Sequence, residues 1–302
     1  MYYYYEHTQH CAPFHVINEF VHTIPAVISI PHSGTYLTQQ MKQNLKPDIV
    51  LPNTDWYLPV LYSFLQQLGY TVIVNHTSRY VADVNRSLED AKGTSYKTNV
   101  CYTHTTQGYA MYQAEPDVCE LKHRIAYYYQ PYHNGIQKLI SEKLNYYNQI
   151  YFIDLHSFGL DYGADMILGN DFGKTCSASL MSFIEHKLME RGYSVKQNNP
   201  FSGGYLTKYY GTQIKSCQSI QIELWYQTYI NHRVFGNEEF PKVNSVLFQK
   251  NKDKLKEIFI LLKDFLLHFY GNFFNDLIFV VWSIIIFVWY VPNGRWSEAG
   301  SR

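Results

Sequence analysis

The chain has 302 residues, of which 46% are hydrophobic and 17% are charged, enough for one large globular domain or two small ones. Its 25 Lys and Arg residues balance its 25 Asp and Glu residues, so the net charge at pH 7 is zero. Nucleic-acid-binding proteins usually carry a basic stripe, and the balanced charge therefore argues against a nucleic-acid partner.

Short apolar runs rich in β-branched residues predict five strands that are covered on both faces. They are residues 26–31, 71–75, 150–155, 166–169 and 219–224. Helical spacing predicts helices at 55–68, at 116–147 with an interruption at Pro131, at 174–191 and at 241–269. We place Asp55 at the N-cap of the first helix and Gly69 at its end. Strands that alternate with helices favour a three-layer α/β fold with a mostly parallel central sheet.

The composition changes after Tyr270, and we divide the chain into a domain at 1–270 and a hydrophobic C-terminal extension at 271–302. Residues 277–291 contain only one polar side chain, Ser283. As a helix they would span about 22 Å, less than the ~30 Å hydrocarbon core of a bilayer. Two interpretations stay open: a membrane anchor, or an extension that packs on the domain or is poorly ordered.

The five cysteines form no Cys-x-x-Cys pair, which predicts free thiols in a reducing compartment. The N-terminal segment MYYYYEHTQHCAPF lacks the basic and apolar regions of a secretory signal. We therefore expect a cytoplasmic protein, with membrane contact only if residues 277–291 act as an anchor. The sequence does not determine the oligomeric state.

Polar side chains follow several of the predicted strands, at the edge where parallel sheets bind ligands. His32 follows the first strand, His156 ends the third, and Glu223 lies at the end of the last, and each histidine is followed by a serine. Two histidines and a carboxylate on rigid elements are the ligand set of a hydrolytic zinc site. Either histidine alone is also compatible with a hydrogen-bonded loop residue, but the two together favour a metal centre.

Two further features lie near these strand ends. Arg79 and Arg86, with Asn85 beside the second, suggest a clamp for an acidic substrate, because a guanidinium group matches a carboxylate; surface salt bridges are the alternative. In the loop PFSGGYLT, Gly203 and Gly204 permit close backbone approach to a ligand, and an ordinary turn is the alternative. The loop has no nucleotide-binding motif, so we expect no nucleotide.

Six short motifs in this order, PHSG, TDW, SRYVADVNRS, DLHS, PFSGGY and QIELW, make the chain resemble the N-formylglutamate amidohydrolase (deformylase) family. The resemblance runs over residues 25–235, and the helical end to about 270 fits the length of the family. It implies a phosphorylase/hydrolase-like α/β fold related to that of the zinc carboxypeptidases. It also implies hydrolysis of N-formyl-L-glutamate to formate and glutamate, a step of histidine degradation.

The resemblance implies that His32 and His156 bind the metal, either Zn²⁺ or another divalent transition metal. The carboxypeptidases have a glutamate three residues after the first histidine, where this chain has Thr35. We therefore expect the third ligand elsewhere and choose Asp55. Asp154 is the competitor, although it could instead orient His156.

The resemblance also assigns roles to the other polar residues. Glu223 matches the catalytic glutamate, and Arg86 with Asn85 resembles the pair that holds a substrate carboxylate. Arg79 resembles the arginine that binds the carbonyl oxygen or a second carboxylate, and it counts as catalytic for that reason. We expect the glycine loop to contact the substrate through Gly203, Gly204 and Tyr205.

Two alternatives to this function stay open. The chain could hydrolyse another N-acyl amino acid, or a carboxypeptidase-like substrate, on the same fold. It could also be a non-catalytic, membrane-tethered carboxylate-binding protein, which residues 277–291 and the missing glutamate at Thr35 would suggest. The presence of His32, His156 and Glu223 together favours the hydrolase.

Overall fold

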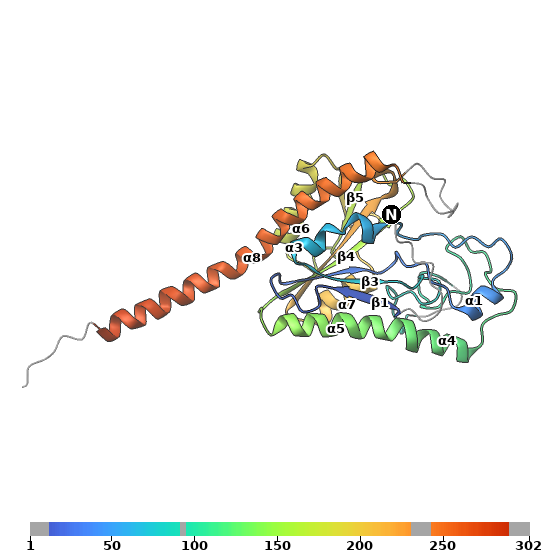
Figure 1. The fold of residues 1–302 in the computed structure, drawn as a ribbon, viewed down its shortest axis with the longest axis horizontal. Helices are drawn as coiled ribbons and strands as arrows, with labels where there is room; N and C mark the ends of the chain where they lie inside the picture. The colour runs from blue at the N-terminus through green and yellow to red at the C-terminus, as the bar shows by residue number, and fades with distance from the viewer. Residues whose placement is uncertain (1–11, 91–94, 231–242, 290–302) are drawn as a thin grey trace, which may run out of the picture.

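The computed structural model describes residues 12–90, 95–230 and 243–289, and of residues 269–289 it describes the backbone only. A seven-stranded sheet forms the middle of the fold, with the strand order β1-β3-β2-β4-β7-β5-β6 (Figure 1). The strands are β1 (Phe14–Ile17), β2 (Ala26–Ile30), β3 (Thr71–Asn75), β4 (Ile150–Phe158), β5 (Met166–Gly169), β6 (Val195–Gln197) and β7 (Cys217–Trp225).

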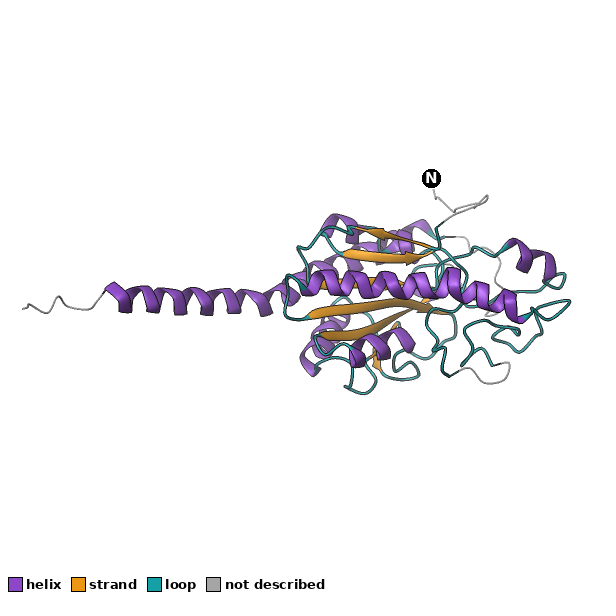
Figure 2. Cartoon of the chain, turned by 90° about the horizontal axis from the view of Figure 1, so that it is seen from below, coloured by secondary structure: helices purple, strands orange, loops and turns teal. Residues whose placement is uncertain are grey.

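Helices cover both faces of this sheet (Figures 1 and 2). They are α1 (Gln39–Asn44), α2 (Leu58–Leu61), α3 (Phe64–Leu68), α4 (Val118–Arg124), α5 (Gln130–Leu144), α6 (Ala178–Glu190), α7 (Tyr205–Gln213) and α8 (Ser245–Trp289). One apolar cluster joins the sheet to α5 and α7, and a larger one joins its other face to α2, α3, α6 and the first half of α8. The expected three-layer α/β fold is confirmed.

The centre of the sheet is parallel. β3, β2, β4 and β7 pair in parallel, whereas β1 and β5 run antiparallel to their neighbours β3 and β7. Every residue of β2, β3 and β4 is buried, which explains the continuous apolar runs in the sequence. Parallel pairing brings the carboxyl ends of β2, β4 and β7 to one edge of the sheet.

The expected helix over 55–68 is in fact two short helices. α2 begins only at Leu58, after Tyr57 in a left-handed conformation with φ of 62°, so Asp55 is not its N-cap. The backbone N–H of Asp55 instead donates to the carbonyl of His32 at 3.0 Å, which holds Asp55 against the end of β2. Gly69 ends α3 with φ of 88°, as expected.

The long helical segment expected over 116–147 is continuous but changes its geometry in the middle. A π-helical turn, Ile125–Tyr129, joins α4 to α5, and Pro131 lies in the first turn of α5. Proline has no N–H to continue the ladder of backbone hydrogen bonds. The hydrogen-bonding pattern of the helix therefore widens from the α to the π type just before it. The interruption therefore precedes Pro131 instead of breaking the helix there.

The sequence-based prediction missed four short elements. β1 and β6 have four and three residues and are only partly buried, so they lack a continuous apolar run. α1 is capped by Thr38 but has only six residues, too few to show a helical period, and α7 begins directly after Gly204 without a side-chain cap. α7 falls where the sequence predicted only a loop.

The C-terminal helix α8 continues through the expected boundary at residue 270 and projects beyond the domain (Figures 1 and 2). Its first half packs on the domain through buried residues that include Phe248, Phe259 and Leu266. Within the described ranges, no helix combines the length and the apolar character needed to cross a membrane. Residues 290–302 lie outside the described residues.

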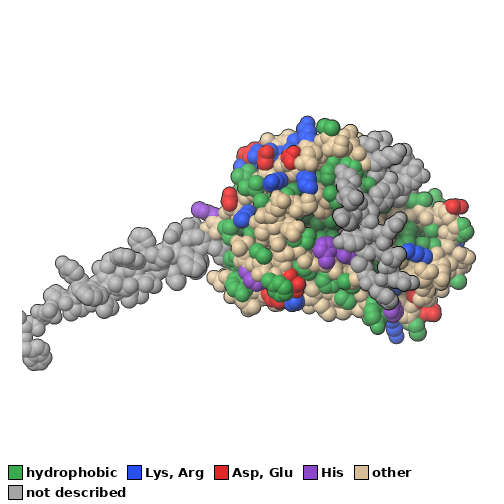
Figure 3. Space-filling model, viewed as in Figure 1, with side chains coloured by type: hydrophobic (Ala, Val, Ile, Leu, Met, Phe, Trp, Pro, Cys, Tyr) green, Lys and Arg blue, Asp and Glu red, His purple; other side chains and the backbone are tan. Residues whose placement is uncertain are grey.

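The described cysteines form no disulfide, and charges of both signs lie on the surface. Cys101, Cys119, Cys176 and Cys217 are free thiols, and Cys11 lies outside the described residues. On the face shown in Figure 3, Lys and Arg side chains lie among Asp and Glu side chains.

The PHSG segment after β2 packs directly against the segment after β3. The Tyr36 N–H donates to the carbonyl of His76 at 3.1 Å, and the Ser78 N–H donates to the carbonyl of Tyr36 at 3.0 Å. Gly34 lies so close to this segment that a Cβ atom there would be 2.2 Å from the carbonyl carbon of His76. Only glycine fits this contact between two backbones.

We expect Gly34→Ala to lower the free energy of unfolding by about 3 kcal/mol, because the neighbouring backbone must move. Gly108→Ala is the control, since Gly108 has a left-handed φ of 88° but no atom within 4 Å of the new Cβ. It should cost only about 1 kcal/mol. Denaturant unfolding of both variants measures the difference, and equal effects would contradict the contact at Gly34.

Candidate metal centre

Three buried side chains from separate parts of the chain meet at the carboxyl edge of the sheet. They are His32 after β2, Asp55 before α2, and His156 on β4, and one ligand atom from each lies within 4.8 Å of the others. Asp55 Oδ2 is 3.1 Å from His156 Nδ1 and 3.9 Å from His32 Nδ1. The structure thus brings together the three residues that the sequence proposed as metal ligands.

Each histidine contacts a further carboxylate through its other ring nitrogen, Nε2. His32 Nε2 lies 2.8 Å from Asp83 Oδ1, and His156 Nε2 lies 2.8 Å from Asp154 Oδ2. An ionised carboxylate can only accept a hydrogen bond, so each Nε2 carries a proton, and Nδ1 is the ring nitrogen that remains to face Asp55. Carboxylates usually orient metal-binding histidines in this way.

The charges around the three residues also fit a cation. Four carboxylates are buried around the three residues, those of Asp55, Asp83, Asp154 and Glu223. Only two guanidinium groups, those of Arg79 and Arg86, lie near them, in the wall of the cavity above the histidines. Buried charges are costly unless they are paired or bind a metal. Two imidazole nitrogens and one carboxylate oxygen are a donor set that suits Zn²⁺ and related transition metals. These residues could therefore hold a metal ion.

The two histidines differ in their affinity for a proton. Burial, followed by the charge of Arg79, lowers the pKa of His32. Burial also lowers the pKa of His156, but the hydrogen-bonded carboxylates of Asp154 and Asp55 outweigh it and raise the pKa well above its usual value. Because a ligand nitrogen must be unprotonated, metal binding at His156 would release a proton.

Asp83 is a central residue of the site that the sequence analysis did not assign. Burial alone would raise its pKa, but Arg79, His32 and Arg86 hold the pKa of Asp83 well below its usual range. It also accepts a short hydrogen bond from the hydroxyl of Tyr102. The signal was present in the motif SRYVADVNRS, where Asp83 stands four residues after Arg79.

Both arginines are largely buried and contact Asp83, so they are not surface salt bridges. Arg79 Nε and Nη2 donate to Asp83 Oδ2 at 3.2 and 2.8 Å. Arg86 donates to the carbonyls of Tyr96 and Asn85 at 3.0 and 2.7 Å, and its Nη2 is 3.9 Å from Asp83 Oδ2. Both line the cavity of about 520 Å³ above the histidines.

Glu223 lies next to His156, in the parallel register of β4 and β7. Its side chain is buried and lines the same cavity. Burial raises the pKa of Glu223 to about 7; His156 opposes this effect, and Asp55 and Asp154 add to it. A carboxyl group with this pKa can both accept and return a proton near neutral pH.

Gln221, which the sequence analysis also did not assign, connects Glu223 to the glycine loop. Gln221 Nε2 donates to Glu223 Oε1 at 2.7 Å, and Gln221 Oε1 accepts the backbone N–H of Gly204 at 2.6 Å. The two bonds require opposite ends of one amide group. Gln221 therefore fixes both the Glu223 side chain and the start of α7.

The glycine loop forms one wall of the cavity and is fixed by Asn85 as well. Asn85 Oδ1 accepts the N–H of Leu206 at 2.8 Å, and its Nδ2 lies 3.3 Å from His156 Nε2. Gly203 and Gly204 line the cavity, and a Cβ on Gly204 would lie 2.3 Å from Asn85 Nδ2. Tyr205 does not line this cavity; it lines a neighbouring one.

Comparison with known proteins agrees with this arrangement. The sequence model described as N-formylglutamate amidohydrolase matches residues 24–230. An N-formylglutamate deformylase from Pseudomonas aeruginosa is 30% identical over 222 residues, 70% of this chain and 84% of that protein. One from Pseudomonas putida is 29% identical over 219 residues, 68% of this chain and 82% of that protein.

Solved structures show the same fold. The crystal structure of an N-formylglutamate amidohydrolase from Ralstonia eutropha superposes with a TM-score of 0.71 at 23% identity, covering 85% of this chain and 98% of that one. A protein from Agrobacterium tumefaciens superposes with a TM-score of 0.60 at 16% identity, covering 82% and 93% of the two chains.

We expect Asp154→Asn to weaken zinc binding by about 10- to 100-fold, because it weakens the partner that orients His156. A competitive titration with a zinc-binding dye measures the affinity. Asp253→Asn, at an exposed position on α8, is the matched control and should bind zinc like the unchanged protein. Unchanged affinity in folded Asp154→Asn protein would contradict the orienting role.

Proposed function

The chain belongs to the N-formylglutamate amidohydrolase family, and we propose that it hydrolyses N-formyl-L-glutamate to formate and L-glutamate. The observation that carries this proposal is the shared cavity of the metal-binding cluster, Glu223 and two arginines. The cluster fits a hydrolytic metal centre, Glu223 fits an acid–base group, and the arginines fit an acidic substrate. The reaction cleaves a linear amide bond, with water as the second reactant.

We propose Zn²⁺ as the metal and His32, His156 and Asp55 as its ligands. Held there, Zn²⁺ would supply Lewis acidity to the formyl carbonyl and to water. Asp83 and Asp154 keep the two imidazole rings in the orientation and tautomer that binding requires.

Glu223 moves the proton. As the water oxygen attacks the formyl carbon, Glu223 accepts a proton from that water. It then delivers the proton to the amide nitrogen, so that the C–N bond breaks and the amino group of glutamate leaves. A pKa near 7 suits both steps, and the hydrogen bond from Gln221 holds one carboxylate oxygen while the other is available for transfer.

Arg79 and Arg86 bind the substrate. Their two positive charges are shared with the single carboxylate of Asp83, so this group of three retains one net positive charge. That charge suits a carboxylate of the substrate, and fixing it would place the formyl amide over the metal centre. Arg79, the more deeply buried of the two, is suited to the oxyanion that develops at the formyl oxygen.

The test of this proposal is formate release from N-formyl-L-glutamate by the purified full chain with added zinc, and in parallel with a chelator. We expect formate release with zinc and its loss with the chelator, restored when zinc is returned. A folded, zinc-loaded protein that released no formate would contradict the proposed function. N-acetyl-L-glutamate serves as the comparison that separates a deformylase from a broader amidohydrolase.

Glu223→Gln should retain the metal and lower kcat by at least about 100-fold, because an amide cannot accept the proton from water. Zinc content by atomic absorption and formate release are measured on the same sample. Gln218→Glu is a control on the same strand, since Gln218 lies outside the cavity. Near-normal turnover in metal-loaded Glu223→Gln protein would refute the role of Glu223.

A further inference from the structure

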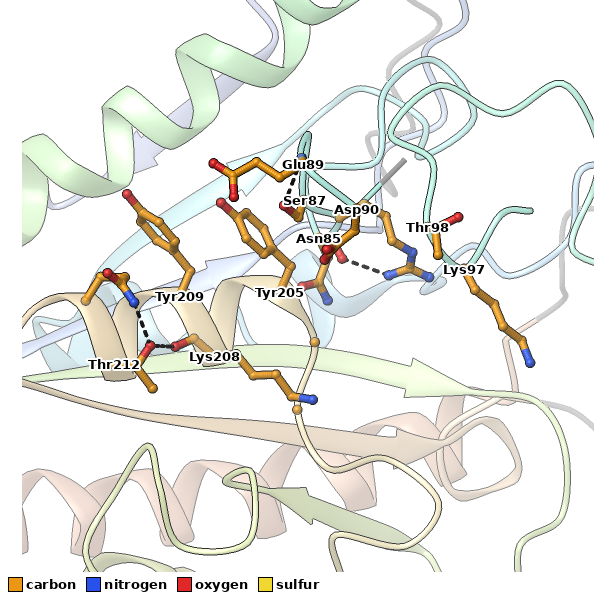
Figure 4. Close-up of a pocket in the computed structure, with 14 residues that line it drawn as sticks. Asn85, Ser87, Glu89, Asp90, Lys97, Thr98, Tyr205, Lys208, Tyr209 and Thr212 are labelled. Carbon is orange, nitrogen blue, oxygen red and sulfur yellow. Dashed lines mark hydrogen bonds between the residues drawn. The ribbon is translucent and has the colours of Figure 1, made fainter. Parts of the chain in front are cut away.

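A second, larger cavity adjoins the one that holds the metal centre. Its volume is about 740 Å³, against about 520 Å³ for the first (Figure 4). The two cavities share four wall residues, namely Asn85, Arg86, Gly203 and Gly204. The second cavity therefore begins where the wall of the first ends, next to a molecule bound over the metal centre.

The first cavity is already large enough for N-formylglutamate. Pockets of about 300–1,000 Å³ hold drug-sized ligands, and this substrate is much smaller than a typical drug. The proposed reaction thus leaves the second cavity without an occupant. The second cavity lies beside Arg86, which we assign to a substrate carboxylate. A further residue attached to that glutamate would therefore lie in the second cavity.

Two of the four residues that the cavities share are glycines, so this part of the wall is backbone only. Gly203 and Gly204 present no side chain there, and a Cβ on Gly204 would collide with Asn85. Gln221 and Asn85 hold the backbone on either side through the N–H groups of Gly204 and Leu206. This part of the wall is therefore fixed in position.

The second cavity carries cations suited to an acidic group. Lys208, in the first turns of α7, and Lys97 line it together with Arg86. Figure 4 shows Lys97 and Lys208 at separate places on the cavity wall, with Asp90 near Asn85 and Glu89 near the rings of Tyr205 and Tyr209. The three cations outnumber the two carboxylates, Glu89 and Asp90, so the lining of the cavity carries one net positive charge.

Building on the proposed function, we propose that the second cavity is a subsite for the residue that follows glutamate in N-formyl-glutamyl peptides, and that it favours an acidic residue. The reaction is unchanged: water adds to the formyl carbon, the formyl C–N bond breaks, and the products are formate and the free glutamyl peptide. Lys208 and Lys97 bind the carboxylate of the second residue, and the tyrosine rings contact its aliphatic part.

The experiment compares formate release from four substrates by the full, zinc-loaded chain: N-formylglutamate, N-formyl-glutamyl-glutamate linked through the α- or the γ-carboxyl group, and N-formyl-glutamyl-lysine. We expect hydrolysis of at least one glutamyl-glutamate isomer, with a kcat/KM several-fold above that of the lysine peptide. The two isomers show which carboxyl group of the glutamate faces the second cavity.

Lys208→Met should lower kcat/KM for the preferred dipeptide by about threefold to fivefold relative to N-formylglutamate, the size expected of one partly exposed ion pair. Lys174→Met is the matched control. Lys174 pairs with the same Asp171 carboxylate as Lys208, at 3.1 and 3.4 Å, but it does not line the cavity, so its removal should leave the preference unchanged.

The outcomes separate this inference from the proposed function. Hydrolysis of N-formylglutamate without hydrolysis of any dipeptide would overturn the subsite and leave the function intact. Equal kcat/KM for the acidic and basic dipeptides, or equal effects of Lys208→Met and Lys174→Met, would also overturn it. Failure to release formate from any of the four substrates would instead contradict the proposed function, and the subsite with it.

Discussion

The buried carboxylate of Asp83 is the contact on which the arrangement of the site depends. It joins the ring of His32 on one oxygen to the guanidinium group of Arg79 on the other, and it also accepts the backbone N–H of Asn85. A buried carboxylate is tolerated only when it is paired and hydrogen-bonded, and here His32, Arg79 and Asn85 are partners that also line the metal-site cavity. The metal ligand and the substrate-binding arginine therefore take their positions from the same group.

The parallel sheet explains why such distant residues meet. His32, His156 and Glu223 follow or end β2, β4 and β7, which are consecutive neighbours in the sheet. The register of β4 and β7 places His156 directly beside Glu223. Because these strands are buried on both faces, their side chains cannot shift without disturbing the core, and the site gains rigidity from the strands that carry it.

The sequence predicted the parts of the fold that depend on local composition. The central strands were recognised because each is a continuous apolar run, and Gly69 was recognised as a helix end because glycine adopts the left-handed conformation easily. The edge strands β1 and β6 were missed because they are short and half-exposed. The sequence correctly grouped Asp55 with the two histidines. It was wrong about the helix, which begins at Leu58, three residues after Asp55.

The rest of the site depends on contacts between distant residues, which a single sequence does not display. The bond from His32 to Asp83 joins residues 51 positions apart, and Asn85 meets Leu206 across 121 positions. Gln221 does not stand out by composition or spacing, and Asp83 is marked only by its place four residues after Arg79. Their importance follows only from the folded arrangement, in which each satisfies two partners at once.

The amide of Gln221 also limits how this protein can change over time. Position 221 needs a donor at one end of its side chain for Glu223 and an acceptor at the other end for Gly204. Glutamate keeps the acceptor but repels Glu223, leucine offers neither group, and asparagine is one methylene shorter and reaches less far. Among the standard amino acids, glutamine alone meets all three demands of length, donor and acceptor, so mutational drift at this position is confined to a single residue for as long as the loop and the carboxylate keep their places.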